Sequence, residues 1–425
     1  MKKIFFIQDT LTNKISYYHL AFILIAMPFD FFYCRLILIS FGLHTLIHAQ
    51  NIKLKNIFTR PVLIFMSISL LAFAGILYSE DKDEGLSMAT RQWAILIIPV
   101  LFSITCLNLE KYKLNLICIF GLSCTLTIIY LYADAVYTIY YFHMPFSSLF
   151  TLIFMNHNFS MPVKLHATYL SIYTALSLLA FLYLLFNKKA LQQKWVYIIC
   201  TVVLCVGLIQ LSSRAVFIAF FIVFNLVFPF FLFHGKKRII FFLTASFISV
   251  AVLLLIFKVD SFKTRYISEL KTDLKGDVKI IENTEPRLAR WKGLMELVKK
   301  SPVVGYGTGA ERKLLKEKYF EKGLYISYVN EFNAHSQYLS ILLRFGIIGL
   351  ALFIYILYFG FVNAIRKKDI VFLSFLVIIA VVSVSENYLD MDRGIFFYSF
   401  FFSIFLLNGR RAAVHSLPVK KSNPY

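Results

Sequence analysis

The feature that most constrains this chain is a succession of apolar runs separated by short polar loops. The runs have about 15 to 25 residues, the length of helix that the hydrocarbon core of a bilayer requires. Of the 425 residues, 59% are hydrophobic and 16% are charged, whereas soluble proteins carry about 25% charged residues. The sequence therefore predicts an all-α integral membrane protein.

Breaks at proline, glycine, asparagine and charged residues divide the apolar runs into about twelve predicted transmembrane spans. They cover residues 16–30, 33–49, 61–78, 93–109, 114–135, 166–186, 195–211, 214–234, 239–257, 336–362, 369–386 and 394–408. The segment 136–165 is too polar and too interrupted for a full span, so we expect an interfacial or re-entrant piece there.

The basic residues indicate how the spans are oriented. The formal net charge is +21, and the positive residues gather in every second loop. They lie before the first span, at 53–60, 111–113, 188–194, 236–238 and 366–368, and in the tail at 409–425. Because such loops face the cytoplasm, we expect both termini to be cytoplasmic. No basic stripe interleaved with aromatic residues is present, so we expect no nucleic-acid partner.

This orientation predicts four parts of the chain. Residues 1–257 form an N-terminal transmembrane bundle of nine spans, 258–335 a long extracytoplasmic helical loop, 336–408 the last three spans, and 409–425 a basic cytoplasmic tail. In the loop, apolar residues recur at helical spacing over 287–300, and Pro302 and the glycines of SPVVGYGTGA end that helix. The loop is too short and too charged for an independent hydrophobic core, so we expect it to lie against the membrane mouth.

Two arginines at the outer ends of predicted helices are candidate anion ligands. Arg214 begins a span in LSSRAVFIAF, where Ser212 and Ser213 could add neutral donors, and Arg287 follows Pro286 at the start of the loop helix. A guanidinium group binds phosphate oxygens through a bidentate fork. The alternatives are an interfacial arginine that snorkels to lipid headgroups and an ordinary solvated arginine.

His335 is the candidate base, at the outer mouth of the tenth span in NAHSQYLSILLRFGIIGL. The unperturbed pKa of histidine, near 6.5, makes it the natural proton acceptor at neutral pH. The alternative is a structural histidine at the membrane interface. A pair of arginines and a histidine on one side of one membrane favours chemistry on a phosphorylated substrate at that face.

A metal site is a weaker candidate. Asp81-Lys82-Asp83 and Asp390-Met391-Asp392 each place two carboxylates on the outer side, and such a pair can hold a divalent cation. The motif is short and no other ligand type accompanies it. We therefore expect no metal and no cofactor, and activity that survives a chelator would exclude the metal site.

Three ordered motifs resemble one known family. LSSRAVFIAF resembles its Ser-Ser-Arg span start, RLARWKGLMELVKKSPVVGYGTG its Arg-x-x-x-Trp helix and Pro-x-x-Gly-x-Gly turn, and HSQYLSILLRFGIIGL its histidine-led span with a Gly-x-x-Gly element. The family is the O-antigen ligase and polymerase superfamily of bacterial envelope glycosyltransferases, and the resemblance covers roughly residues 205–400.

The resemblance implies a GT-C-like enzyme and a role for each site residue. Arg214 and Arg287 would bind the diphosphate of an undecaprenyl diphosphate donor, with Arg290 in reserve, and His335 would activate the acceptor hydroxyl. KLHATYLSIY places His166 and Tyr169, and SENYLDMDRGIFF places Glu386, where relatives have substrate-binding residues. Arg393 departs from the family pattern, in which a neutral amide is more frequent.

The resemblance also implies the reaction and its place. We expect a ligase that transfers the lipid-linked glycan to lipid A–core oligosaccharide at the periplasmic face of the bacterial inner membrane. A polymerase and a protein O-oligosaccharyltransferase differ only in the acceptor and remain open. A non-enzymatic transporter of the same lipid is less favoured, because transporters concentrate ionisable residues near the bilayer midplane.

Overall fold

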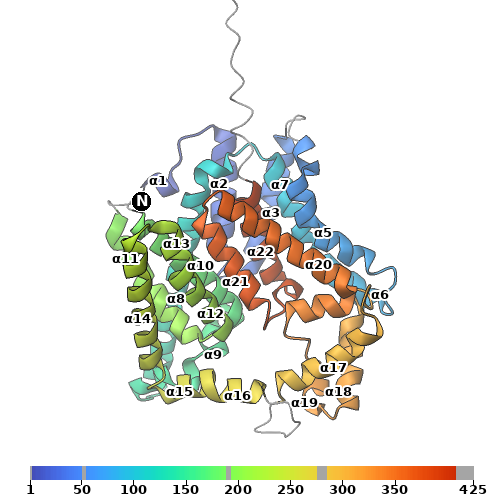
Figure 1. Ribbon diagram of the computed structural model, residues 1–425. Helices are drawn as coiled ribbons and strands as arrows, with labels where there is room; N and C mark the ends of the chain where they lie inside the picture. The colour runs from blue at the N-terminus through green and yellow to red at the C-terminus, as the bar shows by residue number, and fades with distance from the viewer. Residues whose placement is uncertain (1, 50–53, 188–192, 275–284, 408–425) are drawn as a thin grey trace, which may run out of the picture.

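The computed structural model describes residues 2–49, 54–187, 193–274 and 285–407. It is 81% helical, and no strand occurs among the described residues, which confirms the all-α prediction. Figure 1 shows the long helices side by side in one bundle, with several short helices gathered at one end. The predicted basic tail at 409–425 lies outside the described residues.

Every predicted span coincides with a helix. The helices are α2 (Leu11–Ala26), α3 (Phe31–Ile47), α5 (Arg60–Ala74), α7 (Trp93–Ile104), α8 (Leu109–Tyr141), α10 (Ala167–Phe186), α11 (Lys194–Leu211), α12 to α13 (Arg214–Leu232), α14 (Lys236–Ile256), α20 (Gln337–Arg366), α21 (Ile370–Val382) and α22 (Asp392–Leu406). Within the described ranges, seven helical segments are long and apolar enough to cross a membrane, and three shorter helices are also apolar. The protein is a multi-pass membrane protein, and the count of twelve crossings stays a prediction.

Several predicted boundaries are wrong by four residues or more, among them those of α8 and α21. Helix α8 runs from Leu109 to Tyr141, well beyond the predicted span 114–135, because its tyrosine-rich last turns continue the helix up to the break before Pro145. Helix α21 ends at Val382, before the predicted end at 386. After α8 the chain forms only short turns, η2 (Phe146–Phe150), η3 (Leu152–Phe154), α9 (His157–Ser160) and η4 (Met161–Val163), which agrees with a segment that does not span.

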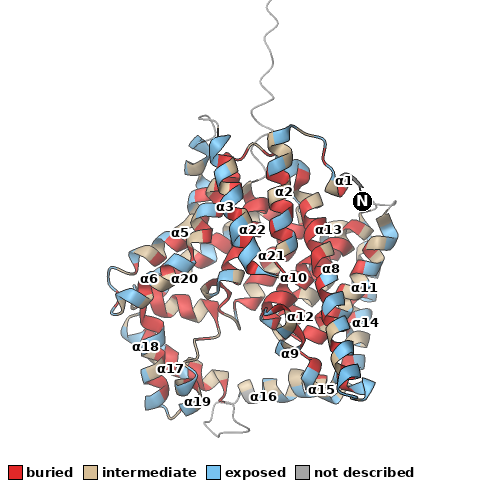
Figure 2. Ribbon diagram, turned by 180° about the vertical axis from the view of Figure 1, so that it is seen from behind, coloured by how far each residue is buried: buried red, intermediate tan, exposed pale blue. Residues whose placement is uncertain are grey.

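Helices α10, α21 and α22 form the centre of the bundle. Almost every residue of α10 and α22 is buried, whereas α14 is exposed along most of its length, at the edge of the bundle (Figure 2). Aromatic rings fill the interior, as where Phe65 stacks on Phe402 with ring centroids 4.6 Å apart. A helix that is apolar all round is buried in a protein core or surrounded by membrane lipid, and α22 is buried among other helices.

The predicted extracytoplasmic loop forms the short helices at one end. They are α15 (Asp260–Lys263), η7 (Thr264–Ser268), α16 (Glu269–Asp273), α17 (Arg287–Lys300), α18 (Ala310–Glu321) and α19 (Tyr325–Val329). Figure 1 shows α15 to α19 at the opposite end of the bundle from α1 (Lys2–Phe5). Helix α17 has the predicted bounds 287–300.

The loop contributes most of a small hydrophobic core that it shares with α20. Leu294 of α17, Leu315 and Tyr319 of α18 and Leu324 before α19 are buried in one cluster, separate from the main core. The cluster forms because Leu343 of α20 adds an apolar side chain to it. The first turns of α20 therefore complete a core that the loop lacks by itself.

Helix α20 is interrupted at Gly346, whose φ is 59°. The turn after α17 packs into this break: the Ile347 N–H donates to the Pro302 carbonyl at 2.9 Å, and the Gly307 N–H donates to the Arg344 carbonyl at 2.8 Å. A Cβ on Gly346 would lie 2.2 Å from the Val303 carbonyl oxygen, so only glycine fits. The two glycine-containing motifs of the sequence thus join the loop to the membrane bundle.

Candidate active site

Arg214 and Arg287 are each the first residue of a helix. Ser212 ends α11 in a left-handed conformation (φ 44°), Ser213 precedes α12, and Arg214 begins it. Arg287 begins α17 directly after Pro286, as predicted. The N-terminal end of a helix carries free N–H groups and a partial positive charge. Both arginines therefore stand at backbone positions that favour an anion.

The structure brings these two arginines together on one carboxylate. Arg214 Nη2 lies 2.6 Å from Asp273 Oδ2, and Arg287 Nε lies 3.7 Å from Asp273 Oδ1. Arg287 also donates from Nη1 to the Ser385 carbonyl at 3.1 Å. The side chains of Arg214 and Arg287 are 17% and 25% exposed, so both remain accessible. The two predicted arginines therefore lie close together, and the carboxylate of Asp273 pairs with both of them.

Arg290 lies one turn further along α17 and is buried. Its guanidinium carbon is 5.1 Å from the centre of the Phe332 ring, and Phe332 in turn meets the His335 ring edge-on with centroids 5.6 Å apart. Among the described residues no hydrogen bond reaches its Nε or Nη1. Burial lowers the pKa of Arg290, although an arginine of this kind stays charged at neutral pH.

His335 occupies an unusual backbone position. Its φ is 45°, in the left-handed region that non-glycine residues rarely adopt. The neighbouring backbone is held on both sides: the Ala334 carbonyl accepts from Trp291 Nε1 at 2.8 Å, and the His335 N–H donates to Asn333 Oδ1 at 3.0 Å. Strained positions of this kind persist only where surrounding contacts fix them, and they concentrate at functional sites.

The environment of the His335 ring keeps it neutral. In the described part of the chain no hydrogen bond engages either ring nitrogen. Burial, then the charges of Arg290 and Arg287, then His166 lower the pKa of His335 to about 3. A neutral imidazole has a free lone pair at pH 7 and can accept a proton.

Four of the predicted site residues line one cavity of about 560 Å³: His166, Tyr169, His335 and Glu386. The rings of His166 and Tyr169 are in contact, with centroids 5.5 Å apart, and Thr168 Oγ1 donates to Glu386 at 3.4 Å. Burial raises the pKa of Glu386, while Arg287 opposes that effect. The other lining residues are Asp30, Phe31, Phe32, Arg35, Arg91, Lys164, Asn333, Asn387, Asp390, Met391, Asp392 and Arg393. Arg214, Arg287 and Arg290 are outside the lining.

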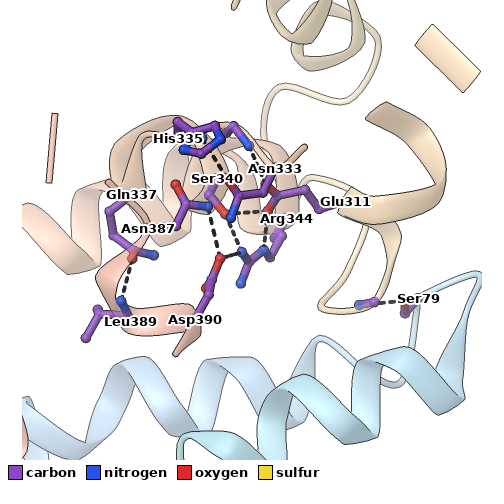
Figure 3. A network of polar contacts seen from close by, with 12 residues as sticks. Ser79, Glu311, Asn333, His335, Gln337, Ser340, Arg344, Asn387, Leu389 and Asp390 are labelled. Atoms are coloured by element: carbon purple, nitrogen blue, oxygen red, sulfur yellow. Dashed lines mark hydrogen bonds and ion pairs between the residues drawn. The ribbon is translucent and has the colours of Figure 1, made fainter. Parts of the chain in front are cut away.

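A buried charge network that the sequence analysis missed supports this site (Figure 3). Arg344 of α20 is 1% exposed and donates from Nε to Glu311 Oε2 at 2.7 Å, while its Nη2 pairs with Asp390. The other oxygen of Glu311 accepts the Ala334 N–H at 3.1 Å, and Ser340 bonds the same carboxylate group. Glu311 therefore joins the loop that carries His335 to an arginine inside the bundle. An arginine within an apolar span, as in ILLRFGIIGL, was the available signal.

The two Asp-x-Asp motifs have structural roles. Asp81 begins α6 (Lys82–Arg91), and its Oδ1 accepts the Glu84 N–H at 2.9 Å. Asp390 pairs with Arg344, and Asn387 donates to it at 2.9 Å. The first carboxylate of each motif is thus engaged within the chain.

A comparison with protein families decides the affiliation of this segment. Residues 199–354 match the family model Wzy_C, which describes O-antigen ligase. This segment is similar to the O-antigen ligase family. The match confirms the predicted superfamily, and it includes Arg214, Arg287, Arg290 and His335 but not His166, Tyr169 or Glu386. No curated protein matches the chain.

Proposed function

We propose that this protein is an O-antigen ligase-type glycosyltransferase. It transfers a glycan from undecaprenyl diphosphate to a hydroxyl of lipid A–core oligosaccharide at the periplasmic face of the bacterial inner membrane. The observation that carries the proposal is the convergence of Arg214 and Arg287 on one carboxylate, that of Asp273. The family match over residues 199–354 supports the reaction class.

In the proposed reaction, Arg214 and Arg287 bind the donor diphosphate in place of Asp273. A neutral His335 accepts the proton of the acceptor hydroxyl, and the oxygen forms a bond to the anomeric carbon. The bond from that carbon to the diphosphate breaks, and the diphosphate leaves with the electron pair. A single displacement inverts the anomeric configuration. General-base assistance contributes about 10²–10⁴ in rate.

Fixed cations stabilise the charge that develops on the leaving diphosphate. Two guanidinium groups at helix N-termini supply positive charge at this position, so the proposed step needs no metal ion and no cofactor. Arg290 is the third cation. Its guanidinium group lies over the Phe332 ring, and that ring contacts the His335 ring edge-on. His166, Tyr169 and Glu386 are the proposed substrate-binding residues of the cavity.

The alternatives differ from this proposal in the acceptor. A polymerase would use a second lipid-linked repeat, and an oligosaccharyltransferase would use a protein hydroxyl, with the same donor site and base. A transporter of the lipid would need no base. His335 lines a cavity, and no described residue forms a hydrogen bond to its ring nitrogens, which favours transfer over transport.

The test is a reconstituted reaction. Purified protein is incubated with undecaprenyl-diphosphate glycan and, in separate reactions, with lipid A–core oligosaccharide, with a second lipid-linked repeat and with a hydroxyl-bearing peptide. Mass spectrometry identifies the products. We expect the glycan to be transferred to lipid A–core oligosaccharide. NMR of the product should show an inverted anomeric configuration at the new bond. Product on another acceptor alone would establish one of the alternatives, and no product with any acceptor would contradict enzymatic transfer.

A further inference from the structure

A second group of cations lines the His335 cavity. Arg35, Arg91, Lys164 and Arg393 all belong to its wall. They come from four separate places in the chain: the first turns of α3, the last residue of α6, the residue after η4, and the first turn of α22. Since these segments are distant in sequence, the fold itself gathers the four positive charges around one cavity.

Among the described residues, these four cations have no carboxylate partner of the kind that Arg214, Arg287 and Arg344 have. Throughout the described ranges, no ion pair involves Arg35, Arg91, Lys164 or Arg393, whereas Arg214, Arg287 and Arg344 are all paired. Arg393 Nη1 is buried without a hydrogen-bond partner among those residues. A buried guanidinium nitrogen without a partner is costly. The four cations are therefore available to bind an anion that enters the cavity.

The acidic residues of the same wall are mostly engaged within the chain. Asp30 accepts the Phe32 N–H at 2.8 Å at the start of α3, and Asp390 pairs with Arg344. Glu386 accepts from Thr168, and burial raises its pKa, which favours its neutral form. Asp392 is the remaining carboxylate. Because Arg344 already compensates Asp390, the four cations of the wall face three further carboxylates, those of Asp30, Asp392 and Glu386, and positive charge is in excess.

A smaller cavity of about 330 Å³ extends this space. It shares Asp30, Lys164 and Arg393 with the His335 cavity and continues past Tyr130 and Pro162. The two cavities adjoin at these shared residues, and we refer to them together as the groove. Aromatic side chains, which sugar rings can contact face-on, line it at Phe31, Phe32, Tyr130 and Tyr169.

We propose that this groove is the acceptor subsite and that it binds a glycan carrying a phosphate or carboxylate group, which Lys164 and Arg393 hold while His335 takes the proton of the attacking hydroxyl. The inference rests on the proposed transferase function. Guanidinium and ammonium groups bind both anions through charge-assisted hydrogen bonds. Anionic lipid headgroups offer the same chemistry, so the experiment has to separate the two sources.

The experiment uses the full chain in vesicles of neutral phospholipid, with lipid-linked glycan as donor. Three synthetic acceptors share the same hydroxyl: a neutral oligosaccharide, the same with a phosphate monoester, and the same with a uronic acid. KM for each acceptor is measured for the wild type, for the double variant Lys164→Gln/Arg393→Gln, and for Lys313→Gln as a control. Lys313 is an exposed lysine that pairs with Glu80, outside the groove. A second series adds anionic phospholipid.

We expect the wild type and Lys313→Gln to have KM values about tenfold lower for the two anionic acceptors than for the neutral one, a difference of about 1.4 kcal/mol. The double variant should lose this preference and still bind the donor. The preference should persist in anionic vesicles. Equal KM values for all three acceptors in the wild type, or a preference that anionic lipid removes, would overturn the inference while leaving the transferase intact. Absence of product with every acceptor would overturn the transferase proposal as well.

Discussion

Arg214 and Arg287 pair with the same carboxylate, that of Asp273, at 2.6 Å and 3.7 Å. The arginines come from helices α12 and α17, which the chain separates by the whole of α14, α15 and α16. In the proposed reaction Asp273 therefore occupies the place of the donor diphosphate. A diphosphate carries more charge and more acceptor oxygens than one carboxylate, so it can displace Asp273 from both arginines.

This arrangement predicts opposite effects of two substitutions on donor binding. Arg214→Gln should weaken the affinity for undecaprenyl-diphosphate glycan by about tenfold or more, because it removes a charge-assisted contact. Asp273→Asn should tighten the affinity severalfold, because the competing charge is gone. The measurement is the donor Kd in detergent or nanodiscs, with Glu269→Gln as the control for an unrelated ion pair of the same loop. Weaker binding by Asp273→Asn would show that Asp273 positions the arginines and does not compete.

Glu311 is predicted to act on His335 by positioning its loop. Glu311→Gln keeps an acceptor for the Ala334 N–H but weakens the pair with Arg344, which retains Asp390. Breaking a buried ion pair costs about 3–5 kcal/mol, so we expect a lower Tm and a reduced kcat with an unchanged donor Kd.

The matched control is Asp369→Asn, which weakens the Lys113–Asp369 pair at 2.6 Å but keeps the Asp369 cap of α21. It should lower Tm without lowering kcat at a temperature where both variants are folded. If both variants lose kcat to the same extent, the effect of Glu311 is stability alone.

The pH dependence should differ between the free enzyme and the donor complex. Burial and the two neighbouring arginines lower the pKa of His335 to about 3, so in the free enzyme the base stays neutral as the pH falls through 6.5. A bound diphosphate neutralises the arginines and raises this pKa. The acid limb of kcat, which reports the complex, should therefore lie at a higher pH than the acid limb of kcat/KM. Coincident limbs in both profiles would contradict this electrostatic coupling.

Treatment with a chelator distinguishes metal-independent transfer from the alternative, in which an Asp-x-Asp motif holds a divalent cation. We expect full transfer activity in excess EDTA, because Asp81 caps α6 and Asp390 pairs with Arg344. The assay is product formation after dialysis against the chelator, with and without added Mg²⁺ or Mn²⁺. Loss of activity that either cation restores would assign a catalytic role to a metal ion.

Local signals in the sequence predicted the helices well and their ends less well. Apolar runs bounded by charge gave every helix of the bundle, and the spacing of Leu288, Trp291, Leu294 and Val298 gave the bounds of α17. The end of α8 was not predicted, because its last turns are rich in tyrosine and extend the helix beyond the apolar run that marked the span. The separate loop core was missed, because it depends on Leu343, a residue of another element.

The predicted site was limited in the same way. Arg214, Arg287 and His335 were chosen as candidates because they are ionisable residues at the ends of predicted helices. A charge at such a position in a membrane protein costs free energy, so its presence there requires an explanation. Asp273, Glu311 and Arg344 were missed because their importance lies in partners that are distant in the chain. Of the cations of the groove, only Arg393 was noted from the sequence, as a departure from the family pattern. Single-residue chemistry is visible in a sequence, whereas pairing across elements requires the fold.

The most direct test of the central claim is the single-turnover rate of His335→Ala in parallel with its donor affinity. With purified protein, a defined undecaprenyl-diphosphate glycan and the preferred acceptor, we predict a fall in rate of about 10²–10⁴, an unchanged donor Kd, and full activity of the exposed-histidine control His48→Ala. A His335→Ala variant that transfers the glycan at the wild-type rate would contradict the assignment of His335 as the base, and with it the proposed mechanism.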